Sequence, residues 1–244
     1  MDGIINFIKG ELLDLRNMTP EEMAAHDAEI ELRERHQAAQ EKIERYQKSG
    51  VPERYYNEAL DTYKITNEMQ ATAAKAATNF LHAVKCGKFK SLVLIGNAGT
   101  GKTHLACAII REVGGKYRTA PDIVEEMRRA KSFTANDTEA DIIKYYGHVP
   151  LLVIDEIGRG IAATDEKYML YQILNARYNT RKPTVLISNL KKSDFLQYIG
   201  VAAADRLVES AEVWELNGES YRCELRAQKC LKATTSNFLN YRAD

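Results

Sequence analysis

Residues 91–103, with the sequence SLVLIGNAGTGKT, decide how the rest of the chain is interpreted. The apolar run Ser91–Ile95 predicts a short buried strand, and a helix is predicted from Lys102 to Glu112. Between them the residues match the pattern G-x-x-x-x-G-K-[ST] in full. A glycine-rich backbone can wrap around a phosphate, with its N–H groups and the positive helix end directed at the anion. The sequence therefore predicts a nucleotide-binding loop made of Gly96, Asn97, Ala98, Gly99, Thr100, Gly101, Lys102, Thr103 and His104.

Two side chains of this loop and one acid downstream predict a metal-nucleotide site. Lys102 carries a positive charge that can reach the β- and γ-phosphates, and the Thr103 hydroxyl can ligate Mg²⁺. A second apolar run, Leu151–Ile154, ends in Asp155. Because the carboxyl ends of parallel strands meet at one edge of a sheet, we expect Asp155 to lie near the Mg²⁺ bound by Thr103.

The next residue, Glu156, is the expected general base, which orients and deprotonates the attacking water. An Asp-Glu pair after a strand is commonly only a helix cap or a turn. The complete phosphate loop about fifty residues upstream favours the functional interpretation. Because a nucleotide kinase needs no water-activating glutamate, the pair favours hydrolysis over phosphoryl transfer to a small acceptor.

A third strand is predicted over Thr184–Ser188, and it ends at Asn189. An amide at that position can lie between the γ-phosphate and the water and so sense hydrolysis. The alternative is a turn residue that caps the segment Lys191–Tyr198. The spacing alone leaves both interpretations of Asn189 open.

Strands and helices alternate after residue 87, which predicts an α/β fold with a parallel sheet and helices on both faces. Before that point, Thr66–Val84 has a helical stripe of apolar residues and ends at Gly87. Further helices are expected over Pro121–Lys131, Ala140–Tyr146 and Asp165–Tyr178.

The first fifty residues differ from the rest. A short apolar helix is expected over residues 4–15, and Thr19–Glu22 forms a capping box with proline at the first helical position. The charged helix that follows runs to about Lys48. Its sparse apolar positions are typical either of a solvated strut or of a surface that needs a partner. We therefore divide the chain into a partner-binding region 1–50, a linker 51–65 and an ATPase domain 66–244.

The composition narrows the class of partner. In this chain of 244 residues, 34 Lys and Arg balance 34 Asp and Glu, so any nucleic-acid contact must come from a local patch. None of the four cysteines lies in a C-x-x-C pair or clusters with histidine, which favours free thiols over a zinc site. The chain begins without a secretory signal, and its apolar runs are too short to span a bilayer. We expect a cytoplasmic protein with no membrane partner.

Five motifs, in order, carry a family resemblance. GNAGTGKTHLA, LLVIDEIG, RY…RKPTVLISNL, ADRLVE and NGESYR, between Phe89 and Arg222, resemble the DnaC/IstB branch of the AAA+ ATPases. Within that branch the chain is most similar to DnaC-type helicase loaders. The resemblance implies a P-loop AAA+ sheet between helices. It also implies a minimal lid, since only twenty-two residues follow Arg222.

The resemblance further implies a function and roles for three more residues. Such a protein binds ATP and Mg²⁺ and loads the replicative, DnaB-like helicase onto single-stranded DNA in replication initiation. Its N-terminal region grips the helicase, and its ATPase domains associate with one another. Asn189 matches the sensor-1 residue, Arg206 the arginine finger presented to a neighbouring subunit, and Arg222 the sensor-2 residue. For each arginine taken alone, a surface ion pair is the usual alternative.

Two aromatic residues, Phe133 and Tyr168, lie in regions that line the DNA-contacting face in this family. Base stacking on such side chains contributes about 1–3 kcal/mol per base. The basic residues Arg128, Arg129 and Lys131 lie nearby in the sequence and could track phosphates. The alternative, that both aromatic rings pack against the sheet, stays open.

Two other functions stay open as well. One is an IstB-type transposition helper ATPase that acts on duplex DNA with a transposase, which the stretch Gly218–Arg222 fits equally well. The other is an adaptor that binds ATP as a structural switch and scarcely hydrolyses it. The intact Glu156 argues against such an adaptor.

Overall fold

The sheet at the centre of the molecule has five strands, all parallel, in the order β2-β3-β4-β1-β5. The structure is a computed structural model that describes residues 18–132, 137–160, 163–218 and 220–221. The strands are β1 (Ser91–Gly96), β2 (Lys116–Thr119), β3 (Leu152–Ile157), β4 (Thr184–Ser188) and β5 (Ala211–Leu216). The predicted parallel sheet is confirmed, and the three predicted strands are its three inner members.

The two strands that the sequence did not reveal, β2 and β5, are the edges of the sheet. An inner strand is covered on both faces and is therefore apolar almost throughout, as in β1 and β4, where every residue is buried. The edge strands, KYRT and AEVWEL, are only partly buried and contain charged residues. Their sequences lack the apolar run by which the inner strands were recognised.

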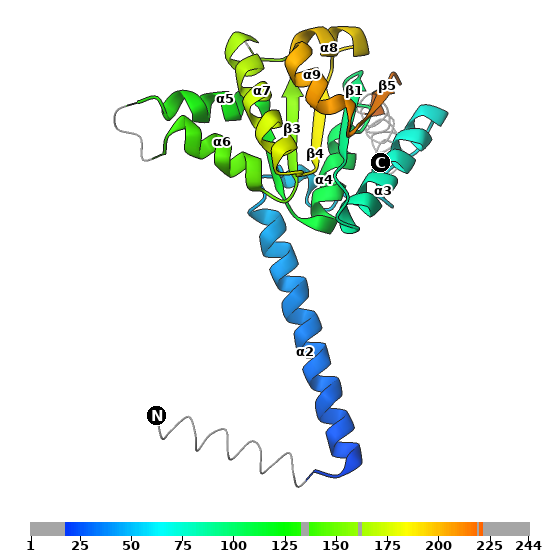
Figure 1. The fold of residues 1–244 in the computed structure, drawn as a ribbon. Coiled ribbons are helices and arrows are strands. Elements are labelled where there is room, and N and C mark those ends of the chain that lie inside the picture. The colour runs from blue at the N-terminus through cyan, green and yellow to red at the C-terminus, as the bar shows by residue number, and fades with distance from the viewer. Residues whose placement is uncertain (1–17, 133–136, 161–162, 219, 222–244) are drawn as a thin grey trace, which may run out of the picture. The chain divides into compact units, whose positions relative to one another are not determined.

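Helices cover both faces of the sheet (Figure 1). One face packs against α3 (Glu68–Lys85) and α4 (Lys102–Val113) through strand residues such as Leu92 and Leu94. The alternate residues Val93 and Ile95 face the other core, which is built with the remaining helices. Those helices are α5 (Ala120–Arg129), α6 (Glu139–His148), α7 (Ala163–Asn179), α8 (Lys192–Ile199) and α9 (Val201–Val208). The helices predicted in this part of the chain are confirmed to within about two residues, and α8 and α9 were not predicted as helices.

The chain divides into two compact units, residues 1–45 and residues 46–244. The first contains nearly all of α2 (Pro20–Gln47), which begins with the predicted capping box. Thr19 N donates to Glu22 Oε2 at 2.8 Å, and Glu22 N donates to Thr19 Oγ1 at 3.3 Å. The helix expected over residues 4–15 and the minimal lid expected after Arg222 lie outside the described residues.

The segment expected to be a linker, 51–65, is part of the second unit. It contains a short 3₁₀ helix, η1 (Glu53–Tyr55), and Val51 and Tyr63 are buried in the core beside α3 and α4. Tyr46, at the end of α2, is buried in the same core. The aromatic residues of this segment therefore pack into the core of the second unit.

Candidate nucleotide-binding site

The predicted phosphate loop connects β1 to α4, at the carboxyl edge of the sheet. Gly96, Gly99 and Gly101 have φ angles of 109°, 84° and 91°, a region that residues with a Cβ atom rarely adopt. At Gly101 a Cβ atom would also lie only 2.4 Å from Tyr63 Cε2. The strand-loop-helix arrangement predicted for this stretch is confirmed, and the glycines are required by its backbone.

Lys102 lies inside the loop that it follows. Its side chain is buried, and Nζ donates hydrogen bonds to the carbonyl oxygens of Gly96 at 2.9 Å and Asn97 at 2.6 Å. A buried ammonium group needs such acceptors because desolvation without them is costly. The loop thus holds a positive charge at the place where the sequence predicts the phosphates.

The predicted metal-binding pair is brought together across the sheet. Thr103 Oγ1, at the start of α4, donates to Asp155 Oδ2, on β3, at 2.8 Å. Tyr117, on the edge strand β2, donates its hydroxyl to the same oxygen at 2.8 Å. Burial raises the pKa of Tyr117, so this hydroxyl remains a protonated donor. Hydroxyl and carboxylate oxygens are hard ligands of the kind that Mg²⁺ prefers, so the residues fit that ion.

Glu156 has an unusual backbone, with φ at 59°. The pairing of β3 with β4 shifts in register between Ile154 and Ile157, so Glu156 lies in a local irregularity of the strand. Its carboxylate is paired with Arg159, with Oε1 3.0 Å from the guanidinium NH1. A non-glycine residue in this conformation stores strain, which is common at functional sites.

These groups line one cavity of about 500 Å³. Lys102, Thr103, Asp155, Glu156 and Asn189 all contribute to its walls. The sequence analysis missed another set of lining residues, which come mostly from the expected linker: Arg54, Tyr55, Glu58, Thr62, Tyr63, Lys64, Gln70, Tyr117 and Tyr221. The aromatic residues of the linker, Tyr55 and Tyr63 among them, were the sequence feature that pointed to a packed segment.

His104, the last residue of the predicted loop, contacts this missed segment. Its Nδ1 lies 2.9 Å from Glu58 Oε2, and its Nε2 lies 2.8 Å from the carbonyl oxygen of Ala59. The Tyr63 ring packs edge-on against the imidazole, with centroids 5.3 Å apart. His104 therefore connects α4 to residues 58–63 through both ring nitrogens.

Arg206 lies far from this cavity along the strands. Its side chain, on α9, donates to Asn175 Oδ1 at 3.0 Å and lies over the Tyr178 ring, 5.2 Å from the centroid. It shares a small cavity with Ser91 and Thr184, the first residues of β1 and β4. The nucleotide cavity lies at the other ends of those strands, so Arg206 cannot reach the nucleotide of its own chain. Arg222 lies outside the described residues.

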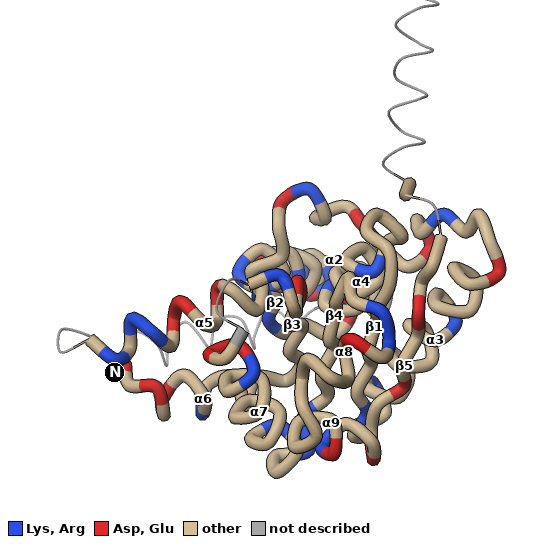
Figure 2. The backbone as a smooth tube through the Cα atoms, turned by 90° about the horizontal axis from the view of Figure 1, so that it is seen from above, with Lys and Arg blue, Asp and Glu red and all other residues tan. Residues whose placement is uncertain are grey.

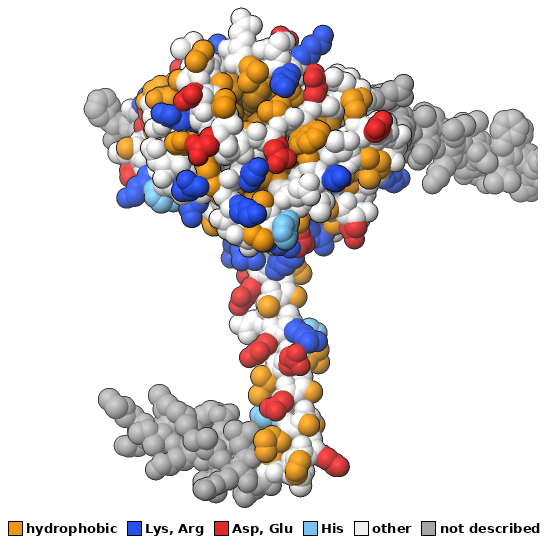
Figure 3. Space-filling view, turned by 45° about the vertical axis from the view of Figure 1, so that its right-hand side comes forward, with side chains coloured by type: hydrophobic (Ala, Val, Ile, Leu, Met, Phe, Trp, Pro, Cys, Tyr) orange, Lys and Arg blue, Asp and Glu red, His pale blue; other side chains and the backbone are white. Residues whose placement is uncertain are grey.

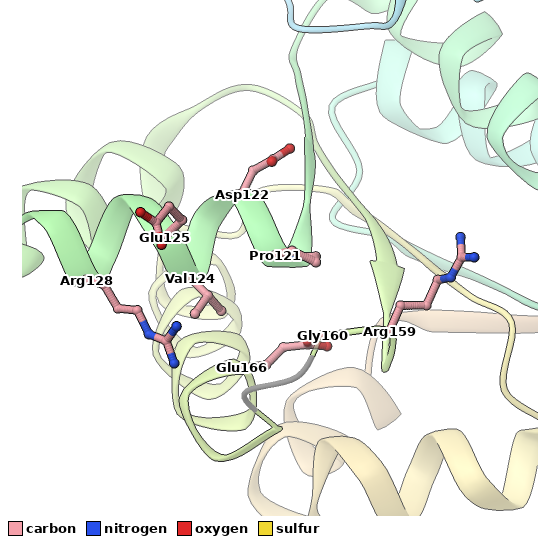
Figure 4. A pocket seen from close by; sticks show the side chains of 8 residues that line it. All are labelled: Pro121, Asp122, Val124, Glu125, Arg128, Arg159, Gly160 and Glu166. Carbon is pink, nitrogen blue, oxygen red and sulfur yellow. The ribbon is translucent and has the colours of Figure 1, made fainter.

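A second cavity, of about 890 Å³, lies beside α5 and the start of α7. Figure 4 shows Arg128 and Glu125 on α5, with Glu166 across from them. Arg159 lines both this cavity and the nucleotide cavity. The larger cavity holds none of the predicted nucleotide-binding residues, which line the smaller one.

The predicted DNA-contacting residues are only partly described. Phe133 lies outside the described residues. Tyr168 is 46% exposed on α7, and Lys131 Nζ lies 6.0 Å from its ring centroid. The nearby basic side chains are paired with acids, Arg128 with Asp165 at 2.7 Å and Lys131 with Glu139 at 3.3 Å. Figure 2 accordingly shows both charge signs along α5. Tyr168 does not pack against the sheet, which was the alternative interpretation.

In the part of the chain that the structure describes, we find no helix long and apolar enough to cross a membrane.

Comparison with known proteins gives one family match and several relatives. The family described as "IstB-like ATP binding protein" matches residues 16–229. A replicative helicase loader DnaC from Buchnera aphidicola subsp. Schizaphis graminum is 30% identical over 193 residues, which cover 75% of this chain and 76% of that protein. An ATP-binding protein of insertion sequence IS232, from Bacillus thuringiensis subsp. berliner, is 31% identical over 144 residues, 54% of this chain and 56% of that protein.

Solved structures share the fold. A crystal structure of the DnaC helicase loader superposes with a TM-score of 0.59 and 24% identity, covering 68% of this chain and 100% of that chain. The similarity confirms the predicted AAA+ arrangement of a parallel sheet between helices.

Proposed function

The chain belongs to the IstB-like ATP-binding family of AAA+ proteins, and from that membership we propose that it loads a replicative DNA helicase onto single-stranded DNA. The observation that carries the proposal is the meeting of Lys102, Thr103 and Asp155 at one cavity. This site lies in a chain that aligns with DnaC relatives over about three quarters of both lengths. We propose that ATP is the substrate of this site and that its hydrolysis drives the cycle.

The residues at the cavity support a division of roles in hydrolysis. The loop amides and Lys102 would bind the phosphates, and Thr103 and Asp155 would hold Mg²⁺. The metal ion, when bound, supplies positive charge that neutralises the β- and γ-phosphate oxygens. Glu156 accepts the proton of the attacking water once its carboxylate leaves Arg159, and Asn189 orients the water against the γ-phosphate.

Self-association through the ATPase unit completes the site in this proposal. Arg206 lies at the opposite ends of the strands from its own nucleotide, so it acts on the nucleotide of a neighbouring copy. Val201 and Val208, on the same helix, are 88% and 82% exposed, as expected of a surface that another copy covers. An arginine finger is worth about 10³–10⁵ in rate. We assign Arg222 to the γ-phosphate of the nucleotide bound by its own chain, by its match to the family motif.

Residues 1–50 are the proposed helicase-binding region. Within them, α2 exposes Met23, Ile30, Leu32 and Ile43, each between 41% and 53% exposed, amid charged side chains (Figure 3). Ion pairs one turn apart, such as Arg33 with Glu29 at 2.7 Å, support the helix. Such a helix keeps its apolar side chains available to a partner.

We assign single-stranded DNA to the surface that carries Tyr168 and Phe133. The exposed ring of Tyr168 offers a face on which a base can stack, and Lys131 provides positive charge beside it. Bound ATP favours the DNA-gripping assembly, and hydrolysis releases it.

The test is capture of the replicative helicase from the source cell's lysate by the full chain and by a chain lacking residues 1–45. The full chain should capture the helicase. The truncated chain should lose it yet still bind ATP, because the ATPase unit starts at residue 46. Capture of the helicase by the truncated chain would contradict the assignment of the N-terminal region.

One observation favours a second candidate, a transposition helper that works on duplex DNA with a transposase. The IS232 relative is as similar in identity as the DnaC relative, although over fewer residues. The same capture experiment separates the two, because a transposase in place of a helicase supports the second. A preference for duplex over single-stranded DNA would point the same way.

A further inference from the structure

The end of α2 and the segment that follows it are bound to the edge of the sheet. We call residues 46–63, which include the last two residues of α2, the connector. Tyr117 N, on β2, donates to the carbonyl oxygen of Ser49 at 2.8 Å, and Lys116 Nζ donates to the carbonyl oxygen of Lys48 at 2.7 Å. Gly50, with φ at 88°, comes so close that an added Cβ atom would lie 2.6 Å from the carbonyl oxygen of Tyr117. The connector is thus hydrogen-bonded to the edge strand β2.

The same tyrosine reaches the predicted metal site. The Tyr117 side chain is buried in the core that contains Tyr46 and Val51 of the connector. Its hydroxyl donates to Asp155 Oδ2, the oxygen that also accepts from Thr103 Oγ1. Tyr117 therefore touches the connector with its backbone and ring, and the metal-binding carboxylate with its hydroxyl.

We propose that Tyr117 is a positioning residue that fixes the Asp155 carboxylate for the divalent metal, and that the connector holds Tyr117 in place. The inference rests on the proposed ATP-binding function. A carboxylate can turn about its terminal torsion, so a rigid buried donor keeps one oxygen in the orientation that the metal needs. Loss of such an outer hydrogen bond to a metal-binding carboxylate costs about 10–100-fold in metal affinity or activity.

A second tyrosine, Tyr63 in the connector, provides a contrast to Tyr117 on β2. The hydroxyl of Tyr63 donates to the carbonyl oxygen of Thr100, in the phosphate loop, at 2.8 Å. Tyr63 therefore supports the loop that would bind the phosphates, whereas Tyr117 supports the edge that would bind the metal. Removal of the two hydroxyls should produce two different signatures in nucleotide binding.

The experiment measures the affinity of the full chain for a fluorescent ATP analogue in EDTA and in excess Mg²⁺. The ratio of the two affinities is the metal-dependent gain. Tyr117→Phe should lower this gain about tenfold or more while the affinity in EDTA stays unchanged. Tyr63→Phe should lower the affinity already in EDTA. The matched control is Tyr146→Phe, a buried tyrosine whose hydroxyl donates to Glu126 at 2.6 Å, away from the cavity; it should change neither value.

Gly50→Ala tests the connector without touching the hydroxyl and remains informative if Tyr117→Phe fails to fold. It should lower the metal-dependent gain in the same direction, because its methyl group pushes against the Tyr117 backbone. An unchanged gain in Tyr117→Phe, or an equal loss in EDTA and in Mg²⁺, would overturn the positioning role. A metal-dependent gain in Gly50→Ala equal to that of the unsubstituted chain would overturn the role of the connector. Absence of ATP binding in the unsubstituted chain would instead refute the proposed function.

Discussion

The helix α2 and the connector are neighbours in sequence but differ in what stabilises them. Among the residues of α2, Tyr46 is the one that is buried, and the rest of the helix depends on its cap and on ion pairs one turn apart. The connector, in contrast, is held by a backbone hydrogen bond to β2 and by its own side chains buried in the core beside α3 and α4. Local interactions stabilise α2, whereas tertiary contacts make the connector part of the second unit.

The largest expected effect separates the two regions by truncation. A chain that begins at residue 46 should keep its melting temperature and its ATP affinity. A chain that begins at residue 65 loses the buried side chains of Tyr46, Val51 and Tyr63. Each such side chain contributes about 1.5–3 kcal/mol, so this chain should lose roughly 5 kcal/mol or more of stability. Thermal unfolding monitored by circular dichroism measures the difference, and equal melting temperatures would refute the distinction.

The next effect concerns chemistry alone. Glu156→Gln should lower kcat for ATP hydrolysis by about 10²–10⁴-fold, because the amide cannot accept the proton of the water. ATP affinity and helicase capture should remain, since neither α2 nor the phosphate loop changes. Steady-state turnover and a pull-down check the two parts. Turnover equal to that of the unsubstituted chain would instead support an adaptor that uses ATP as a structural switch.

A smaller effect sharpens the description of α2. Ile30 and Leu32 are both exposed but lie two residues apart, and therefore on nearly opposite faces of the helix. Single substitutions to serine should leave the melting temperature unchanged, and the one on the contacted face should weaken helicase binding by about 1.5–3 kcal/mol, the value of one buried aliphatic side chain. Titration of each variant against the helicase identifies the face. Two unaffected affinities would exclude this part of α2 from the interface.

The smallest effect tests the ion pair at the site. Exposed pairs contribute about 0.2–1 kcal/mol, so Arg159→Ala should raise turnover in the absence of DNA by less than about fivefold. The increase is expected because the Glu156 carboxylate no longer needs to leave a partner. Arg33→Ala, which removes an exposed pair on α2, is the matched control and should not alter turnover. Reduced turnover in Arg159→Ala would show that the arginine assists the reaction.

The sequence revealed those parts of the candidate site that a short run of neighbouring residues is enough to identify. The inner strands are apolar runs. In the loop between Gly96 and Thr103, glycines occupy the positions where the backbone has a positive φ angle. Tyr63 and Tyr117 escaped because their roles depend on partners 37 and 38 residues away, Thr100 and Asp155. Neither tyrosine belongs to a pattern that marks such a contact. The edge strands were missed for a related reason, since half-covered strands need no continuous apolar run.

The placement of Arg206 at the far ends of the strands also determines how many complete active sites an assembly of copies would contain. If this guanidinium serves a neighbour, each contact between copies joins a donor face to a different, acceptor face, so the copies stack head to tail. A closed ring then has as many complete sites as subunits. An open ring or a spiral has one complete site fewer than subunits. The nucleotide at one end then has no arginine from a neighbour, and the Arg206 at the other end has no nucleotide to act on. The fraction of bound nucleotides that are hydrolysed would therefore show whether the ring of copies is open or closed.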